Sequence, residues 1–278
     1  MYFYIDPAIL TIGPLSIRYY GLVYALAFLA FYMLLLKKRH HIHFSEEECS
    51  EFLLTTGLSM MIFGRLFHFI IDNPSLLIQN PFEFFAIWHG GIAFFGSFAG
   101  LIVGALGYLY VKKKPIKKTF WFASDLVALV GAGGLIFGRI TNFINQELVG
   151  TISQSPWCIN FLIGFSEVGK PLYDPVCRHP YQLYAAFTHL ILFIILFFIY
   201  KANTKQKEKK QRHGIVFVQF IILYSIMRFI VDFWREDVRF LVGLTSWQLI
   251  SIVSALVGIW LYRYMKKTNW KQRGTQKK

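Results

Sequence analysis

The segment Leu183–Tyr200, LYAAFTHLILFIILFFIY, decides the fold, and the basic segment 201–212, KANTKQKEKKQR, follows it directly. The first segment contains no Asp, Glu, Lys or Arg. It approaches the ~20 residues with which an α-helix crosses the hydrocarbon core of a bilayer. Clustered cations after such a segment are typical of a loop on the cytoplasmic side of a membrane. The two segments together predict a membrane-spanning helix that ends at the cytoplasmic surface.

Six further segments have the same apolar character: Tyr19–Leu36, Phe52–Ile71, Gly91–Val111, Phe120–Phe137, Ile215–Phe233 and Trp247–Tyr264. A membrane β-barrel would instead show short segments of alternating polarity. The composition agrees, because 55% of the 278 residues are hydrophobic and 16% are charged, whereas soluble domains carry about 25% charged residues. We predict an all-α polytopic membrane protein with seven transmembrane helices in a single domain, residues 1–278.

The cations follow alternate spans. Of the 29 Lys and Arg residues, 21 lie in four segments, 37–39, 112–118, 201–212 and 263–278, after the first, third, fifth and seventh spans. The positive-inside rule makes these segments cytoplasmic, which places the N-terminus outside and the C-terminus in the cytoplasm. The net charge of +14 then reflects topology, and we expect no nucleic-acid binding. We also expect no cleavable signal peptide, because no basic residue precedes Arg18.

Seven of the other eight cations are arginines, whose planar guanidinium can bind a phosphate or a carboxylate through two hydrogen bonds. Arg65 lies within the second span, and Arg228 and Asp232 lie four residues apart on the sixth. Charges at this depth are costly and usually face a cavity, a partner or a substrate. For both sites two interpretations stay open: an ion pair that holds the helices together, or a functional role.

The segment 138–150, GRITNFINQELVG, concentrates polar side chains at the outer end of the fourth span. Arg139, Asn142, Asn145 or Gln146, and Glu147 recur at intervals of three and four residues, so on a helix they would share one face. The alternative is an ordinary polar loop that enters solvent. The apolar residues between these positions favour a segment that remains in the membrane interface.

Other polar segments reach the same outer face: Trp88–Gly91 with Phe94–Ser97, His179–Tyr184, Phe233–Asp237 and Tyr20. Arginines at headgroup depth indicate a phosphate-bearing lipid ligand, and two of them could stabilise the charge on a departing phosphate. A lipid or anion transporter would need polar groups through the full depth of the membrane, whereas these groups cluster in the outer half. A seven-helix receptor or binding module is a further alternative.

Three motifs carry a family resemblance: Gly138-Arg139-x-x-Asn142-Phe143-x-Asn145-x-Glu147-x-x-Gly150, His179-Pro180-x-Gln182-Leu183-Tyr184 and Arg228-Phe229-x-x-Asp232-Phe233-x-Arg235. In this order they resemble the prolipoprotein diacylglyceryl transferase family of bacteria. The resemblance implies a multi-pass enzyme of the bacterial inner membrane with its active site towards the outer, periplasmic side. The implied partners are the lipid bilayer, phosphatidylglycerol and preprolipoprotein signal peptides with a lipobox cysteine. No cofactor and no metal are expected.

Members of this family move the diacylglyceryl group of phosphatidylglycerol to the thiol of the lipobox cysteine, so that a thioether forms and glycerol phosphate leaves. The resemblance implies catalytic roles for Tyr20, Arg139, Glu147, His179 and Arg235. It implies phosphatidylglycerol binding by Arg65, Gly90, Gly91, Gly96, Arg139, Asn142, Gly150, Asp232 and Arg235.

One position departs from the family pattern. Phe95 stands where the family has a histidine that is a favoured general base, and Ser97 replaces a glycine. Three explanations stay open. Another group can act as the base, the candidates being Tyr20, His89, Glu147 and His179. Alternatively, the arginines lower the pKa of the substrate thiol, or the chain is a divergent paralogue with altered or weak activity.

The one long outside segment, about residues 150–180, predicts a small external head between the fourth and fifth spans. Cys158 and Cys177 both lie in this head, where an oxidising compartment would allow a disulfide. The sequence leaves their pairing open, because it does not give the distance between their Cα atoms.

Overall fold

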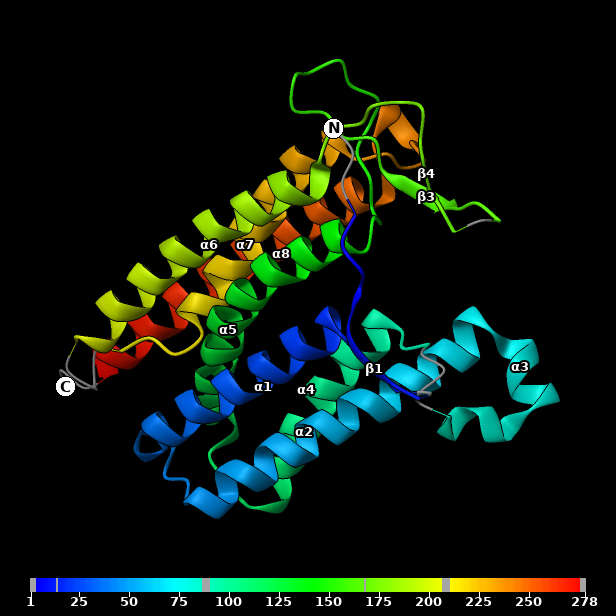
Figure 1. The fold of residues 1–278 in the computed structure, drawn as a ribbon. Helices are drawn as coiled ribbons and strands as arrows, with labels where there is room; N and C mark the ends of the chain where they lie inside the picture. The colour runs from blue at the N-terminus through cyan, green and yellow to red at the C-terminus, as the bar shows by residue number, and fades with distance from the viewer. Residues whose placement is uncertain (1–3, 14, 87–90, 168, 207–210, 276–278) are drawn as a thin grey trace. The chain divides into compact units, whose positions relative to one another are not determined.

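The computed structural model describes residues 4–13, 15–86, 91–167, 169–206 and 211–275 (Figure 1). The chain forms two compact units. The first contains Met1–Ala30 and Ser124–Lys278, and the second contains Phe31–Ala123. The boundary falls within helix α1 (Tyr19–Lys38) and helix α5 (Ile116–Ile144), so each unit receives part of both helices.

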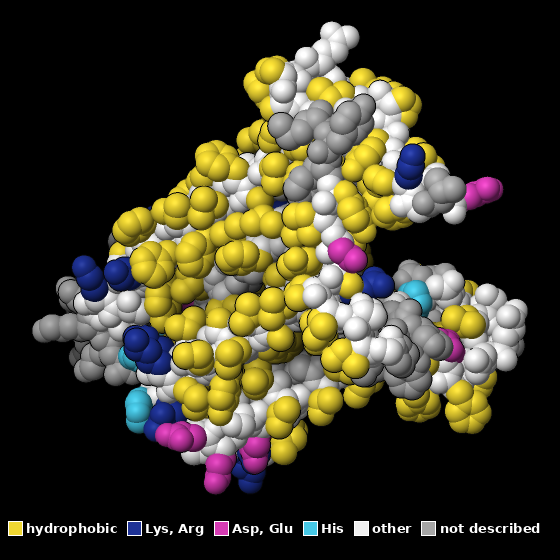
Figure 2. All heavy atoms as spheres, viewed as in Figure 1, with side chains coloured by type: hydrophobic (Ala, Val, Ile, Leu, Met, Phe, Trp, Pro, Cys, Tyr) yellow, Lys and Arg dark blue, Asp and Glu magenta, His cyan; other side chains and the backbone are white. Residues whose placement is uncertain are grey.

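Six helical segments in the described part of the chain are long and apolar enough to cross a membrane: Tyr19–Ile42, Glu46–Ile71, Ile116–Ile144, Tyr181–Thr204, Ile215–Trp234 and Ser246–Lys267. Hydrophobic side chains cover the flanks of the helices in Figure 2. On α6 (Tyr181–Thr204), Phe187 and Phe198 are exposed, as expected for positions that face lipid. The prediction of a mostly helical polytopic membrane protein is therefore confirmed.

The third predicted span corresponds to α4, Phe94–Val111, whose apolar part, Phe95–Val111, is shorter than the six spans. The fourth predicted span is longer than expected, because α5 continues beyond Phe137 to Ile144. This extension makes the beginning of the polar segment 138–150 helical.

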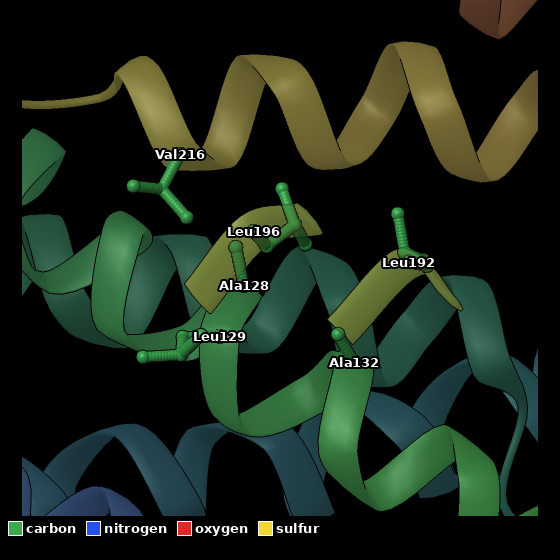
Figure 3. Close-up of a cluster of buried hydrophobic side chains, with 6 residues drawn as sticks. All are labelled: Ala128, Leu129, Ala132, Leu192, Leu196 and Val216. Atoms are coloured by element: carbon green, nitrogen blue, oxygen red, sulfur yellow. The ribbon is translucent and has the colours of Figure 1, made fainter. Parts of the chain in front are cut away.

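In the first unit, α5 packs with α6 and α7 (Ile215–Val231), and α8 (Ser246–Thr275) packs on α7 (Figure 1). Figure 3 shows part of this core, which contains Ala128, Leu129, Ala132, Leu192, Leu196 and Val216. The alanines of α5 allow the leucines of α6 to approach closely, as is common where helices pack in membranes. Asp125 of α5 accepts hydrogen bonds from the backbone N–H groups of Gly214 (2.7 Å) and Phe217 (2.9 Å). It therefore caps the start of α7.

In the second unit, α2 (Glu46–Phe67) packs on α4. A capping box formed by Ser45 and Glu48 starts α2. Glycines four residues apart on α4 let the two backbones approach: a Cβ atom at Gly100 would lie 2.8 Å from the Phe63 Cβ atom, and one at Gly104 would lie 2.7 Å from the Ser59 hydroxyl. Short elements complete this unit: η1 (Arg39–Ile42), the π-helical η2 (His68–Asp72), α3 (Pro74–Gln79) and η3 (Pro81–Phe85).

Two small antiparallel sheets belong to the first unit. Strands β1 (Ala8–Ile12) and β2 (Leu15–Arg18) form a hairpin before α1. Strands β3 (Leu162–Phe165) and β4 (Pro171–Tyr173) lie in the predicted head segment. Cys158 and Cys177, whose Cα atoms lie 5.5 Å apart, form a disulfide across this segment. The short helices η6 (Asp232–Trp234) and η7 (Leu241–Gly243) connect α7 with α8.

Candidate active site

The last turns of α5 present Arg139 and Asn142, and the chain then reverses to bring Glu147 back to them. Asn142 is buried, and its Oδ1 atom accepts a hydrogen bond of 3.1 Å from Arg139 Nη1. Gln146 and Leu148 both have positive φ angles, 58° and 54°, which end the helix and turn the backbone. The expectation of one continuous helical face is therefore wrong for Glu147: a left-handed turn, and not helical periodicity, places it beside Asn142.

One oxygen of the Glu147 carboxylate accepts three hydrogen bonds. Its Oε1 atom accepts hydrogen bonds from the Tyr20 hydroxyl (2.8 Å), Asn142 Nδ2 (2.9 Å) and Asn145 Nδ2 (3.2 Å). Asn142 Nδ2 also contacts the Tyr20 hydroxyl. In the described part of the chain, no hydrogen bond reaches the other oxygen, Oε2, and the Glu147 residue is exposed. Tyr20 and two asparagines of the polar segment 138–150 thus meet around the carboxylate of Glu147, which keeps one oxygen available.

Gly150 joins this cluster to the segment that carries Arg235. The two residues form an antiparallel backbone bridge, supported by a hydrogen bond of 2.9 Å from Thr151 N to Trp234 O. A Cβ atom at Gly150 would lie 2.8 Å from both the His179 Cβ atom and the Trp234 carbonyl, and it would also collide with the His179 carbonyl. Glycine is therefore required here for close approach of three backbone segments.

Arg235 lies over the ring of Tyr181, with 6.0 Å between its Cζ atom and the ring centroid. The Tyr181 hydroxyl donates a hydrogen bond of 2.6 Å to Asp232 Oδ1, and Arg228 Nε donates one of 3.0 Å to Asp232 Oδ2. The ion-pair interpretation of Arg228 and Asp232 is therefore confirmed. Asp232, which is fully buried, is linked to Arg235 through the ring of Tyr181 and through a backbone hydrogen bond of 3.2 Å from Arg235 N to the Asp232 carbonyl.

His179 precedes α6 and contributes its backbone to the cluster. Its N–H donates to the Thr151 carbonyl at 2.9 Å. Its side chain faces another group, because Nδ1 lies 3.1 Å from the Tyr184 hydroxyl, which also accepts a hydrogen bond of 2.7 Å from Trp157 Nε1. Among the described residues, the imidazole of His179 contacts Tyr184, and no hydrogen bond or ring contact joins it to Glu147 or Arg235.

Four buried polar atoms of this region have no hydrogen-bond partner in the described chain: Arg139 Nε, Arg235 Nε, Gln182 Oε1 and Asp237 Oδ2. Two are cationic N–H donors, Gln182 Oε1 is a neutral acceptor, and Asp237 Oδ2 is a carboxylate oxygen that lies 3.5 Å from Arg235 Nη2. Buried polar groups in folded proteins nearly always have partners, so each of the other three atoms indicates a place for a bound molecule. A guanidinium donor suits an anion, and phosphate oxygens fit it well.

The remaining predicted binding residues belong to the second unit and make their contacts within it. Arg65 is buried and donates hydrogen bonds to backbone carbonyls, including those of Phe84 (3.1 Å), Gly91 (3.1 Å) and Ala86 (3.3 Å). These hydrogen bonds place the Arg65 guanidinium against backbone carbonyls of its own unit, and both interpretations of Arg65, ion pair and functional role, stay predictions.

The glycines of this unit have packing roles. Gly91 has a φ angle of 79°, and a Cβ atom there would lie 3.1 Å from Arg65 Nη1. A Cβ atom at Gly96 would collide with α2 at the Phe63 carbonyl and Phe67. Phe95, at the first turn of α4, is 58% exposed. Gly90, Trp88 and His89 lie outside the described residues.

Arg178 is a residue of this region whose role was not predicted from sequence, although its position next to His179 was a signal. Arg178 Nε donates a hydrogen bond of 2.8 Å to Asp174 in the head, and Arg178 Nη1 donates one of 3.3 Å to Glu236, the neighbour of Arg235. The hydrogen bond from Arg178 is the main reason that the pKa of Asp174 lies below its usual value. Arg178 thus connects the disulfide-bonded head to the Arg235 segment.

Comparison with known proteins identifies relatives along nearly the whole chain. The family model described as prolipoprotein diacylglyceryl transferase matches residues 7–264. A phosphatidylglycerol–prolipoprotein diacylglyceryl transferase of Desulfotalea psychrophila is 35% identical over 272 residues, which cover 95% of each chain. The proteins of this name from Rhizobium meliloti and Photobacterium profundum are each 32% identical, over 92% and 95% of this chain and 90% and 96% of the relatives. The chain therefore belongs to the prolipoprotein diacylglyceryl transferase family.

Proposed function

We propose that this chain transfers the diacylglyceryl group of phosphatidylglycerol to the lipobox cysteine thiol of preprolipoproteins. In this reaction the thiol loses its proton, its sulfur forms a bond to a glyceryl carbon, and the bond between that carbon and the phosphate oxygen breaks. The electron pair of the broken bond leaves with glycerol phosphate, and a thioether remains. The site must therefore stabilise a departing phosphate and accept a thiol proton.

The observation that carries this proposal is the pair of unpartnered guanidinium donors of Arg139 and Arg235. Their Nε atoms are buried, and no group in the described chain pairs with them. Asp237 Oδ2 lies 3.5 Å from Arg235 Nη2, which leaves the Nε edge of Arg235 for a ligand. Two such donors would hold the phosphate oxygens and stabilise the charge that develops as the glyceryl carbon–oxygen bond breaks.

Glu147 is the group that we assign to the thiol proton. Hydrogen bonds from Tyr20, Asn142 and Asn145 orient its carboxylate through Oε1, and Oε2 stays available to accept a proton. Tyr20 and Asn142 then act by positioning Glu147 and Arg139. Asp232 supports Arg235 through Tyr181, and Gly150 holds the Arg235 segment against the cluster. His179 remains a second candidate for the base.

The proposed setting is the bacterial inner membrane, with seven spans, the N-terminus outside and the site on the outer side. The four basic segments on alternate loops support this orientation. In this arrangement α4 is the third span, and the two units act as one transferase domain. A membrane-impermeant thiol reagent should label Gln154→Cys from outside intact cells, and should label Lys113→Cys only after the membrane is opened. The reverse labelling would contradict the orientation.

The activity is tested with purified protein, phosphatidylglycerol and a synthetic lipobox peptide. We expect a peptide whose mass increases by the diacylglyceryl group and an equal amount of free glycerol phosphate. A peptide with serine in place of the cysteine is the control and should give neither product. Folded protein that produces no thioether above this control would contradict the transferase assignment.

The phosphate assignment is tested with Arg139→Lys and Arg235→Lys. Lysine retains the charge but lacks the planar fork and the Nε–H group, so turnover should fall at least about 100-fold in each variant. Arg18→Lys changes an exposed arginine of the same unit and should retain wild-type turnover. Wild-type rates in both site variants would contradict the role of the two guanidinium groups.

A further inference from the structure

Gln182 is a buried residue whose side-chain amide has a hydrogen-bond partner on its nitrogen but none on its oxygen in the described chain. It lies in the first turn of α6 and is fully buried. Its Nε2 atom donates a hydrogen bond of 2.6 Å to the Glu147 carbonyl, which fixes the orientation of the amide because a carbonyl can only accept. Its Oε1 atom is buried without a partner in the described part of the chain. A strong acceptor is therefore held rigidly and left unsatisfied.

Gln182 is linked through its neighbours to both arginines of the site. Glu147, which anchors Gln182 through its carbonyl, connects through Asn142 to Arg139. On the other side Tyr181, the chain neighbour of Gln182, carries Arg235 over its ring. In the described chain, the buried groups of the site without a hydrogen-bond partner are thus two cationic donors, one neutral acceptor and a carboxylate oxygen of Asp237, which lies 3.5 Å from Arg235 Nη2.

This inventory matches a phosphate ester of a hydroxylated alcohol. Phosphate oxygens accept from the two guanidinium groups, and an alcohol hydroxyl donates to a neutral amide oxygen. A lipid phosphate monoester, which has no headgroup alcohol, would leave the amide oxygen of Gln182 without a hydrogen-bond donor. An ammonium headgroup could donate to that oxygen, but it would bring a positive charge next to two arginines, which repel it.

We propose that Gln182 Oε1 accepts a hydrogen bond from a hydroxyl of the phosphatidylglycerol headgroup and so makes the site selective for the glycerol ester. This inference rests on the proposed function for its substrate, and it adds a residue that selects the alcohol part of the headgroup. The arginines would bind the phosphate, which all phospholipids share, whereas Gln182 would recognise the headgroup alcohol, which differs between them.

The test removes each partner of this hydrogen bond in turn. Wild-type protein and Gln182→Met, which has a similar volume and no acceptor of comparable strength, are assayed with phosphatidylglycerol and with phosphatidyl-n-propanol, which lacks both headgroup hydroxyls. Wild type should prefer phosphatidylglycerol by about 5- to 100-fold in kcat/KM, the range for leaving a buried acceptor unpaired. In Gln182→Met the preference should fall to about one.

The ratio separates recognition from structural damage. Loss of the bond from Gln182 to the Glu147 carbonyl would lower the rates with both lipids equally and leave their ratio unchanged. Gln182→Glu retains an acceptor, so it should keep the preference at lower absolute rates. Gln146→Met is the matched control, because both amide atoms of Gln146 already have partners, Leu162 N (2.9 Å) and the Phe143 carbonyl (3.0 Å). It should leave the ratio at the wild-type value.

Binding of the two lipids, measured by competition with a fluorescent phosphatidylglycerol in detergent, gives the same ratio without turnover. A Gln182-dependent preference in binding without any thioether would support this inference and contradict the transferase proposal. Equal use and equal binding of the two lipids by wild type, or a preference that survives in Gln182→Met, would overturn it.

Discussion

The hydroxyl of Tyr20 donates a hydrogen bond of 2.8 Å to the carboxylate of Glu147, although 127 residues separate the two along the chain. This contact joins the first turn of α1 to the turn that follows α5. It helps to orient Glu147 through Oε1, which also accepts from Asn142, the partner of Arg139, while Oε2 stays available.

If Glu147 accepts the thiol proton, Glu147→Gln should lower turnover by about 100-fold or more, because the amide cannot act as a base. The amide oxygen can still accept from Tyr20, so the fold should persist. Tyr20→Phe removes one orienting hydrogen bond and should have a smaller effect. Tyr24→Phe is its control, since Tyr24 stacks on Tyr20 with a centroid distance of 6.4 Å and is itself exposed. If turnover falls more in His179→Gln than in Glu147→Gln, His179 and not Glu147 is the base.

Phe95→His should change turnover by less than about threefold if Glu147 is the base, because a second base then has no proton to remove. Phe95 lies at the first turn of α4 and is 58% exposed, so a smaller histidine ring fits there. Thioether formation is measured side by side with wild type. A large gain in rate would instead mean that this chain is impaired by the missing histidine.

Gly150→Ala should both destabilise the protein and reduce activity. The added Cβ atom would meet the His179 backbone and the Trp234 carbonyl, and relief of such contacts costs about 1–3 kcal/mol. The shift would also open the bridge to Arg235. Gly164→Ala is the matched control, because a Cβ atom there meets nothing within 4 Å. Thermal unfolding and turnover are compared; equal behaviour of the two variants would argue against the close approach at Gly150.

The Arg178–Asp174 pair should make stability sensitive to acid. The folded-state pKa of Asp174 is depressed by Arg178, so the pair contributes fully above the unfolded pKa, about 3.9. The contribution is lost as the pH falls through the lower folded value. Asp174→Asn should therefore lower the unfolding temperature at about pH 6 and reduce its further fall towards about pH 3. Glu167→Gln, on the same head segment, should follow wild type; an Asp174→Asn profile that parallels wild type would contradict this linkage.

Reduction of the Cys158–Cys177 disulfide should lower the unfolding temperature. The bond links residues with a sequence separation of 19, and closing a loop of this size stabilises by about 3 kcal/mol in the chain-entropy description. The double variant Cys158→Ser/Cys177→Ser should show the same lowered temperature with and without reductant. If reductant still lowers the unfolding temperature of the double variant, the effect does not come from this disulfide, and the prediction is contradicted.

Local sequence determined much of the membrane architecture. A span such as Leu183–Tyr200 is recognisable because hydrophobicity over a helix length is a property of the segment itself, and the lysines beside it predict its orientation. The motif at 138–150 likewise indicated where the polar chemistry lies. The turn that bends Glu147 back was not recognised, because positive φ angles at Gln146 and Leu148 depend on the contacts that stabilise them.

The pairing of distant residues was decided only by the tertiary structure. The contact of Tyr20 with Glu147, the bridge between Gly150 and Arg235 and the Cys158–Cys177 bond each depend on how helices and loops pack. The orientation of Gln182 belongs to the same class. Spacing along the chain cannot give these contacts, because the distance between two side chains is set by the packing of the elements that carry them. Hydrophobic length and flanking charge, by contrast, act within one segment and can be read from sequence.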